Sequence, residues 1–175
     1  MDSEQFFVTE EAAEKVNEAD AEFGKLFGRS YGGMVEAYRC DDADAILITL
    51  GSVAGTTRCV VDALREQGKK VGLLKIRCMR PFPSKEVAEI VKNAKFMGVL
   101  EKDISFGFEG VVYTDVCSAL KSAAVDVPAA NYVGGLGGRS ISKADIEGIY
   151  TELLNGSAKV GEANFVNLRR DICGA

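Results

Sequence analysis

Short apolar runs alternate with helical patterns along most of the chain. Three of the runs are almost continuously apolar, as strands buried on both faces of a parallel sheet are. They are "DAILITL", "KVGLLKI" and "KFMGVLE". An alternating run, "MVEAYR", precedes them as an edge strand would, and "AANYVG" follows as a fifth strand.

Four amphipathic segments lie between these runs. Helical spacing of apolar residues indicates helices from Ser52 to Gly68, from Ser84 to Lys92, from Glu109 to Ser122 and from Ser142 to about Leu154. Ser52, Ser84 and Ser142 are placed to cap three of them. The alternation predicts a three-layer α/β fold, in which helices cover both faces of a mostly parallel five-stranded sheet.

A separate N-terminal arm precedes this fold. Residues 9–28 predict a helix that Thr9 can cap, and its apolar stripe includes Phe23, Leu26 and Phe27. The glycine-rich "GRSYGG" then separates the helix from the sheet. An exposed stripe of this kind is uncommon on a monomer, so we expect it to pack on its own domain, with a homodimer as the alternative.

Three divisions of the chain follow from this pattern. We expect a helical arm and linker at 1–33, an α/β domain at 34–155 and a surface tail at 156–175, because the tail has little periodicity.

Charge and hydropathy narrow the class of protein. The net charge is -5 without a basic run, which argues against a nucleic-acid or anionic-membrane partner. No apolar run is long enough to cross a membrane, and the acidic start "MDSEQFFVTEE" is unlike a signal peptide. We therefore expect a cytoplasmic protein.

The inventory of reactive side chains excludes several chemistries. The chain has no histidine, which Ser-His and Cys-His nucleophile pairs require. Its five cysteines are widely spaced without a C-x-x-C pair, so neither a zinc site nor an iron–sulfur cluster is predicted. Neither the G-x-x-x-x-G-K-[ST] nor the G-x-G-x-x-G phosphate motif is present. We predict no catalytic residue and no metal ligand.

An anion site remains a candidate at the start of the second helix. Ligands of open parallel sheets approach the carboxyl ends of the strands, and free N–H groups after Ser52 would attract an anion there. Gly55 and Thr56 lie in the following turn. However, Ser52 can itself cap the helix and no lysine follows, so a structural turn is the favoured interpretation.

Other charged residues follow the predicted strands. Arg139 in "GGLGGRS" either binds a carboxylate or phosphate or lies in an ordinary loop. Arg80 has no identifiable mate, and Glu101, Lys102 and Asp103 are expected to be a solvated cluster. The candidate interface residues are Phe23, Phe27, Arg80, Phe108 and Arg139.

Four motifs occur together in one order: "LGSVAGT", "LLKIRCMRPFP", "DISFGFEG" and "GLGGR". In this order they resemble the C-terminal part of the alpha subunit of pyruvate:ferredoxin oxidoreductase, and the arm "ADAEFGKLFGRSYGGMVEAYR" resembles the junction that precedes it. The resemblance covers the chain to about Leu154 and implies a transketolase C-terminal-like domain, core domain II. Ser140 stands where the family often has Asp, which weakens any role carried over to Arg139.

The resemblance implies a function for the complete enzyme. Such enzymes oxidatively decarboxylate pyruvate to acetyl-CoA with thiamine diphosphate, iron–sulfur clusters and coenzyme A, and they reduce ferredoxin. The implied partners are beta, gamma and delta subunits. This chain lacks the pyrimidine-binding domain, the cluster cysteines and the diphosphate motif, so we expect a structural packing domain that binds no cofactor and is inactive alone.

Two alternatives remain open. The chain could be the equivalent domain of a 2-oxoglutarate or branched-chain 2-oxoacid enzyme. It could also be a freestanding domain that binds a small anion or coenzyme A at Ser52.

Overall fold

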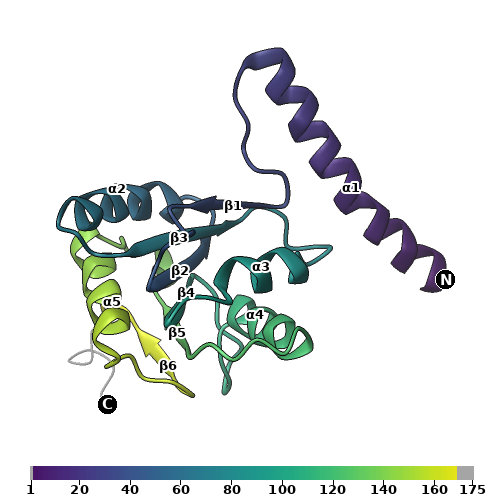
Figure 1. The fold of residues 1–175 in the computed structure, drawn as a ribbon. Coiled ribbons are helices and arrows are strands. Elements are labelled where there is room, and N and C mark those ends of the chain that lie inside the picture. The colour runs from purple at the N-terminus through teal and green to yellow at the C-terminus, as the bar shows by residue number, and fades with distance from the viewer. Residues whose placement is uncertain (1, 169–175) are drawn as a thin grey trace.

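The computed structural model describes residues 2–168 and confirms the three-layer α/β architecture (Figure 1). The helices are α1 (Asp2–Phe27), α2 (Val53–Glu66), α3 (Ser84–Val91), α4 (Val111–Ser122) and α5 (Lys143–Asn155), and a short 3-10 turn, η1, spans Leu136–Gly138. The strands are β1 (Val35–Tyr38), β2 (Ala45–Leu50), β3 (Val71–Ile76), β4 (Phe96–Glu101), β5 (Ala129–Val133) and β6 (Ala163–Phe165).

The sheet has six strands in the order β1-β3-β2-β4-β5-β6, one more than expected. Only β1 is antiparallel, and Val35 pairs with Ile76 at the carboxyl end of β3. The additional strand, β6, comes from the C-terminal segment and pairs in parallel with β5, where Val133 faces Phe165. Three residues are too few for a periodic pattern, and backbone pairing with β5 alone defines this strand.

The two faces of the sheet bury separate cores. Ile46 and Ile48 point towards α3 and α4, whereas Leu47 points towards α2 and α5, because side chains alternate along a strand. Tyr150 of α5 is buried against the second face, and its hydroxyl donates a hydrogen bond to the carbonyl of Gly72 at 2.8 Å. The predicted strand cores are confirmed.

Helix α1 differs from the prediction in its length and in its packing. It begins at Asp2, so Thr9 lies inside the helix and not at its cap. The helix extends away from the sheet (Figure 1). Leu26 and Phe27 are 70% and 63% exposed, and the ring of Phe23 packs on Phe27 with centroids 4.5 Å apart. The preferred packing of the stripe on its own domain was therefore wrong.

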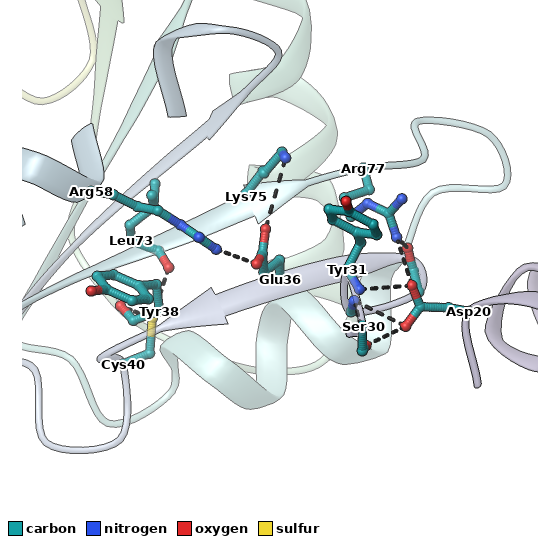
Figure 2. Close-up of polar contacts among 12 residues, drawn as sticks. Asp20, Ser30, Tyr31, Glu36, Tyr38, Cys40, Arg58, Leu73, Lys75 and Arg77 are labelled. Carbon is teal, nitrogen blue, oxygen red and sulfur yellow. Dashed lines mark hydrogen bonds and ion pairs between the residues drawn. The ribbon is translucent and has the colours of Figure 1, made fainter. Parts of the chain in front are cut away.

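Asp20 fixes the direction of α1 (Figure 2). Its carboxylate accepts hydrogen bonds from the N–H groups of Tyr31 and Gly32, at 2.9 and 3.1 Å, and from the hydroxyl of Ser30. Arg77 of the loop after β3 lies 3.4 Å away. The bond from Ser30, followed by the one from Tyr31, lowers the pKa of Asp20. The linker thus folds against α1 and holds its stripe off the sheet.

The β1 edge is tied to α2 by charged side chains. Glu36 forms an ion pair with Arg58 of α2 and lies 3.8 Å from Lys75 of β3 (Figure 2). The hydroxyl of Tyr38 donates a hydrogen bond to Asp62 at 2.8 Å. These contacts fasten one face of the edge strand β1 to α2.

Only one of the three expected serine caps forms. Ser142 accepts a hydrogen bond from the N–H of Asp145, and the Asp145 carboxylate accepts one from the N–H of Ser142, so a complete capping box starts α5. Ser84 is instead the first residue of α3, after Pro83, and Ser52 adopts helical dihedral angles without a side-chain cap bond. A helical Ncap cannot aim its side chain at the next turn.

Candidate functional site

The carboxyl ends of β2 and β4 form the topological switch point of the sheet. These neighbouring strands lead into α2 and α4, and the two helices lie on opposite faces. In open α/β sheets the ligand crevice occurs at this place. Here it is a cavity of about 390 Å³, lined by Leu50, Gly51, Ser52, Val53, Met79, Leu100, Glu101, Lys102, Asp103, Val111, Val112 and Ile141.

Glu101, the last residue of β4, is a buried polar residue of this crevice. Only 2% of it is exposed. Its carboxylate accepts hydrogen bonds from the N–H groups of Val112 and Tyr113, at 2.8 and 3.1 Å, in the first turn of α4. The expectation of a solvated cluster was wrong for Glu101, since the positive end of α4 stabilises a carboxylate there. Lys102 and Asp103 are exposed as expected.

Asn131 of β5 completes the hydrogen-bond network around the Glu101 carboxylate. Its Nδ2 donates to Glu101 Oε1 at 3.1 Å, and its Oδ1 accepts from the N–H of Gly110 at 2.9 Å. The sequence analysis missed this residue. A lone Asn within the apolar "AANYV" is nevertheless a signal, because a polar side chain that is buried in a strand is usually hydrogen-bonded.

Burial sets the protonation behaviour of Glu101. It raises the pKa of the carboxyl, while the bonds from Val112, Tyr113 and Asn131 act in the opposite direction. A carboxylate with these three donors holds the start of α4 in place. We assign it a positioning role and not a role in acid–base catalysis.

The four predicted anion-binding residues do not converge. Ser52 lines the crevice, but Gly55, Thr56 and Arg139 do not. The Arg139 guanidinium donates instead to the carbonyl of Asn167. The crevice is lined by two acidic residues, Glu101 and Asp103, and by one basic residue, Lys102, so its lining carries no excess of positive charge for an anion.

The remaining interface candidates are distributed over the same edge and over α1. Arg80 pairs with Asp115 of α4 at 2.8 Å, a mate 35 positions away that local sequence reasoning could not identify. Phe108 is 66% exposed, and Phe106, which the sequence reasoning had not singled out, is 98% exposed. Phe23 and Phe27 lie on α1, which extends away from the sheet (Figure 1).

Metal-ligating side chains do not gather in the part of the chain that is described. Within residues 2–168, no group of three His, Cys, Asp or Glu side chains could hold an ion. Cys40 is buried, Cys59 is exposed, and Cys78 and Cys117 are half-buried at separate places. Cys173 lies outside the described residues. None of the described helices is long and apolar enough to span a bilayer.

Comparison with protein-family profiles shows the family to which the chain belongs. The profile of pyruvate:ferredoxin oxidoreductase core domain II matches residues 43–146, which include β2 to β5 and the switch-point crevice. The chain belongs to this family. Three of the four motifs of this core domain II, "LGSVAGT", "LLKIRCMRPFP" and "DISFGFEG", contribute residues to the crevice, whereas "GLGGR" does not.

Curated relatives extend the match to most of the chain. Pyruvate synthase subunit PorA of Methanothermobacter thermautotrophicus is 46% identical over 134 residues, 77% of this chain and 34% of the relative. Ketoisovalerate oxidoreductase subunit VorA of Pyrococcus abyssi is 40% identical over 144 residues, 82% of this chain and 36% of the relative. This core domain II therefore spans about a third of the length of these relatives.

Solved structures share the fold. A 2-oxoglutarate:ferredoxin oxidoreductase from Magnetococcus marinus, solved with 2-oxoglutarate, coenzyme A and succinyl-CoA, has a TM-score of 0.53 at 18% identity over 75% of this chain and 21% of that chain. A split-gene transketolase has a TM-score of 0.52 at 12% identity over 69% of this chain and 41% of that chain. The transketolase-like fold is confirmed.

Proposed function

We propose that this core domain II is a structural and inter-subunit packing part of the alpha subunit of a 2-oxoacid:ferredoxin oxidoreductase. The family match across the sheet is the observation that carries the proposal. The site geometry supports it, because the buried carboxylate of Glu101 is engaged in holding α4. The domain contributes a rigid surface, and the chemistry takes place elsewhere in the enzyme.

Pyruvate is the proposed substrate of the complete enzyme. Two of the relatives, at 46% and 45% identity, are named pyruvate synthase subunits. A branched-chain 2-oxoacid is the second candidate, because a relative at 40% identity is named for ketoisovalerate. The likeness to a 2-oxoglutarate enzyme, at 18% identity, supports the fold alone.

The cofactors are assigned to other parts of the enzyme. In the family, thiamine diphosphate, iron–sulfur clusters and coenzyme A serve the complete reaction. The described residues bring no three thiol or carboxyl ligands together, and of the residues proposed for an anion only Ser52 lines the crevice. We therefore propose that beta, gamma and delta partners carry these groups and pass electrons to ferredoxin.

Reconstitution tests this proposal. The chain is co-expressed with the remainder of the alpha subunit and with the partner subunits, and reduction of ferredoxin is followed with pyruvate or with ketoisovalerate. We expect turnover only in the assembly, with pyruvate preferred. Turnover by the pure chain, or failure of the chain to enter the assembly, would overturn the proposal.

Calorimetry with coenzyme A and with phosphate distinguishes the freestanding binding domain. A packing domain should give no heat of specific binding with either compound. Saturable heat that is lost in Ser52→Ala would instead support the anion-binding alternative.

A further inference from the structure

The apolar stripe of α1 is left uncovered by the rest of the described chain. Its residues recur every three or four positions, so they share one side of the helix. Ala19, Leu26 and Phe27 are exposed, and the other members are half-buried. The stripe consists of Ala12, Val16, Ala19, Phe23, Leu26 and Phe27. An exposed stripe of this kind is uncommon on a monomer, so this face is available to another surface.

A different face of α1 is turned towards the α/β domain. Asn17 accepts a hydrogen bond from the N–H of Met34 at 3.3 Å, and Asp20 is bonded to the linker (Figure 2). At 3.6 residues per turn, this face lies about a third of a turn from the stripe. The packing here is open, since Ala13 of the helix and Pro81 of the loop before α3 line a groove of about 520 Å³. The polar contacts therefore hold the helix in place without covering its stripe.

The helix is strongly acidic, even after its ion pairs with other groups are counted. It contains eight acidic and two basic residues, a net charge of -6. Lys15 pairs with Glu18 at 2.7 Å within the helix, and Arg77 of the α/β domain lies 3.4 Å from Asp20. With Arg77 included, the net charge is still -5. The whole chain has a net charge of -5, so the residues outside α1 have a net of only +1.

Helix stability does not account for this charge. Acidic residues stabilise a helix in its first turn, and only Asp2 and Glu4 lie there. Glu14, Glu18 and Glu22 instead follow one another at intervals of four, and like charges at this spacing destabilise a helix. All three are exposed. Cations on a facing surface would offset their repulsion, which favours a basic partner.

Other occupants match this charge poorly. Two copies of α1 in contact would bring the same negative charge together, and the remainder of a second copy has a net of only +1. Nucleic acids and anionic membranes have the same sign of charge as the helix. The relatives are about three times as long as their match to this chain, so proteins of this family contain further polypeptide surface.

We infer that α1 docks its apolar stripe in a groove on a basic polypeptide surface, in another part of the oxidoreductase. This inference rests on the proposed function and names the element by which the domain assembles. Amphipathic helices enter apolar grooves through anchors at this spacing, here Phe23 and Leu26. Glu11 and Glu22 border the stripe and pair with cations at the rim. Because Asp20 already sets the direction of the helix, little conformational entropy is lost on docking.

Photo-crosslinking in the reconstituted assembly tests the inference. Leu26→p-benzoylphenylalanine is compared with Val160→p-benzoylphenylalanine, since Val160 is 57% exposed and precedes β6 at the edge of the sheet opposite to β1. We expect the probe at position 26, but not the one at 160, to crosslink to a basic segment outside this chain. A crosslink to a second copy, a crosslink to the α/β domain of the same chain, or equal crosslinking at both positions would overturn the inference.

Charge reversal gives a second readout. The Glu11→Lys, Glu22→Lys double variant is compared with Glu66→Lys, Glu147→Lys, which changes the net charge equally at exposed positions of α2 and α5. The α1 variant should melt like the wild type and weaken assembly at least about tenfold at low salt, because it places cations against a basic surface. The loss should shrink as salt screens the charges. The control should assemble like the wild type.

The outcomes separate this inference from the proposed function. Equal weakening by the two double variants, or no weakening by either, contradicts the docking of α1 and leaves the proposed function intact. If the wild-type chain does not assemble at all, both fail together.

Discussion

The carboxylate of Glu101 lies 2.8 Å from the backbone nitrogen of Val112 and accepts its hydrogen bond. The contact joins the end of a central strand to the first turn of the helix that follows it. The connecting loop carries the exposed side chains of Phe106 and Phe108.

Removal of the Glu101 carboxylate should destabilise the fold. Glu101→Ala leaves the N–H groups of Val112 and Tyr113 without their acceptor, at a cost of about 1–3 kcal/mol for each buried group left unpaired. Chemical denaturation measures the change. Glu147→Gln, on the exposed side of α5, is the control and should lie within about 0.5 kcal/mol of the wild type.

The free energy of unfolding should depend on pH through the titration of Glu101. Its folded pKa is raised above the ordinary value of 4.5 by burial. The contribution of this group to stability is therefore fully present below pH 4.5 and is lost as the pH rises through the raised folded pKa. The stability of the wild type minus that of Glu101→Gln should fall over this interval. A difference that is constant with pH would contradict the assignment.

Gly110 should not tolerate a side chain. An added Cβ would lie 1.8 Å from Glu101 Oε1 and 2.7 Å from Asn131 Nδ2, so Gly110→Ala must displace the buried cluster. We expect a loss of about 1–3 kcal/mol, as for other overpacked sites. Gly148→Ala is the matched control, because no heavy atom lies within 4 Å of its added Cβ. In a helix interior it should stabilise by about 0.5–1 kcal/mol.

The central strand should dominate stability. Ile48 is fully buried under α3 and α4, and Ile48→Ala should lower the free energy of unfolding by about 2–5 kcal/mol. Val160→Ala, at an exposed position, should have almost no effect in the same denaturant titration. Equal midpoints for the two variants would place Ile48 outside the core.

The stripe on α1 should be dispensable for the stability of the monomer. Phe27 is 63% exposed and Phe23 packs mainly on other arm residues, so the Phe23→Ser, Phe27→Ser double variant should melt within a few degrees of the wild type. Light scattering is recorded at the same time. A fall in mass would show that a second copy covers the stripe, and a large fall in melting temperature would contradict its exposure.

The sequence by itself determined the layered fold. A continuously apolar strand such as "DAILITL" can bury both of its faces only between two layers of helices. This pattern is carried by consecutive residues, so it can be recognised in the sequence. The motif series was likewise sufficient to indicate the family that the profile confirmed. Ser142 was also predicted to cap the last helix, and this cap is local as well, since the capping box that Ser142 forms with Asp145 lies within four consecutive residues.

Tertiary structure alone decided the partners of the polar side chains. Glu101 meets Asn131, 30 positions away, only because β4 and β5 are neighbours, and Arg80 meets Asp115 only because α4 packs beside α3. Strand β6 depends on pairing with β5, and the direction of α1 depends on Asp20. Hydrophobic periodicity is a property of adjacent positions, whereas a hydrogen bond between distant segments exists only after the sheet has brought them together.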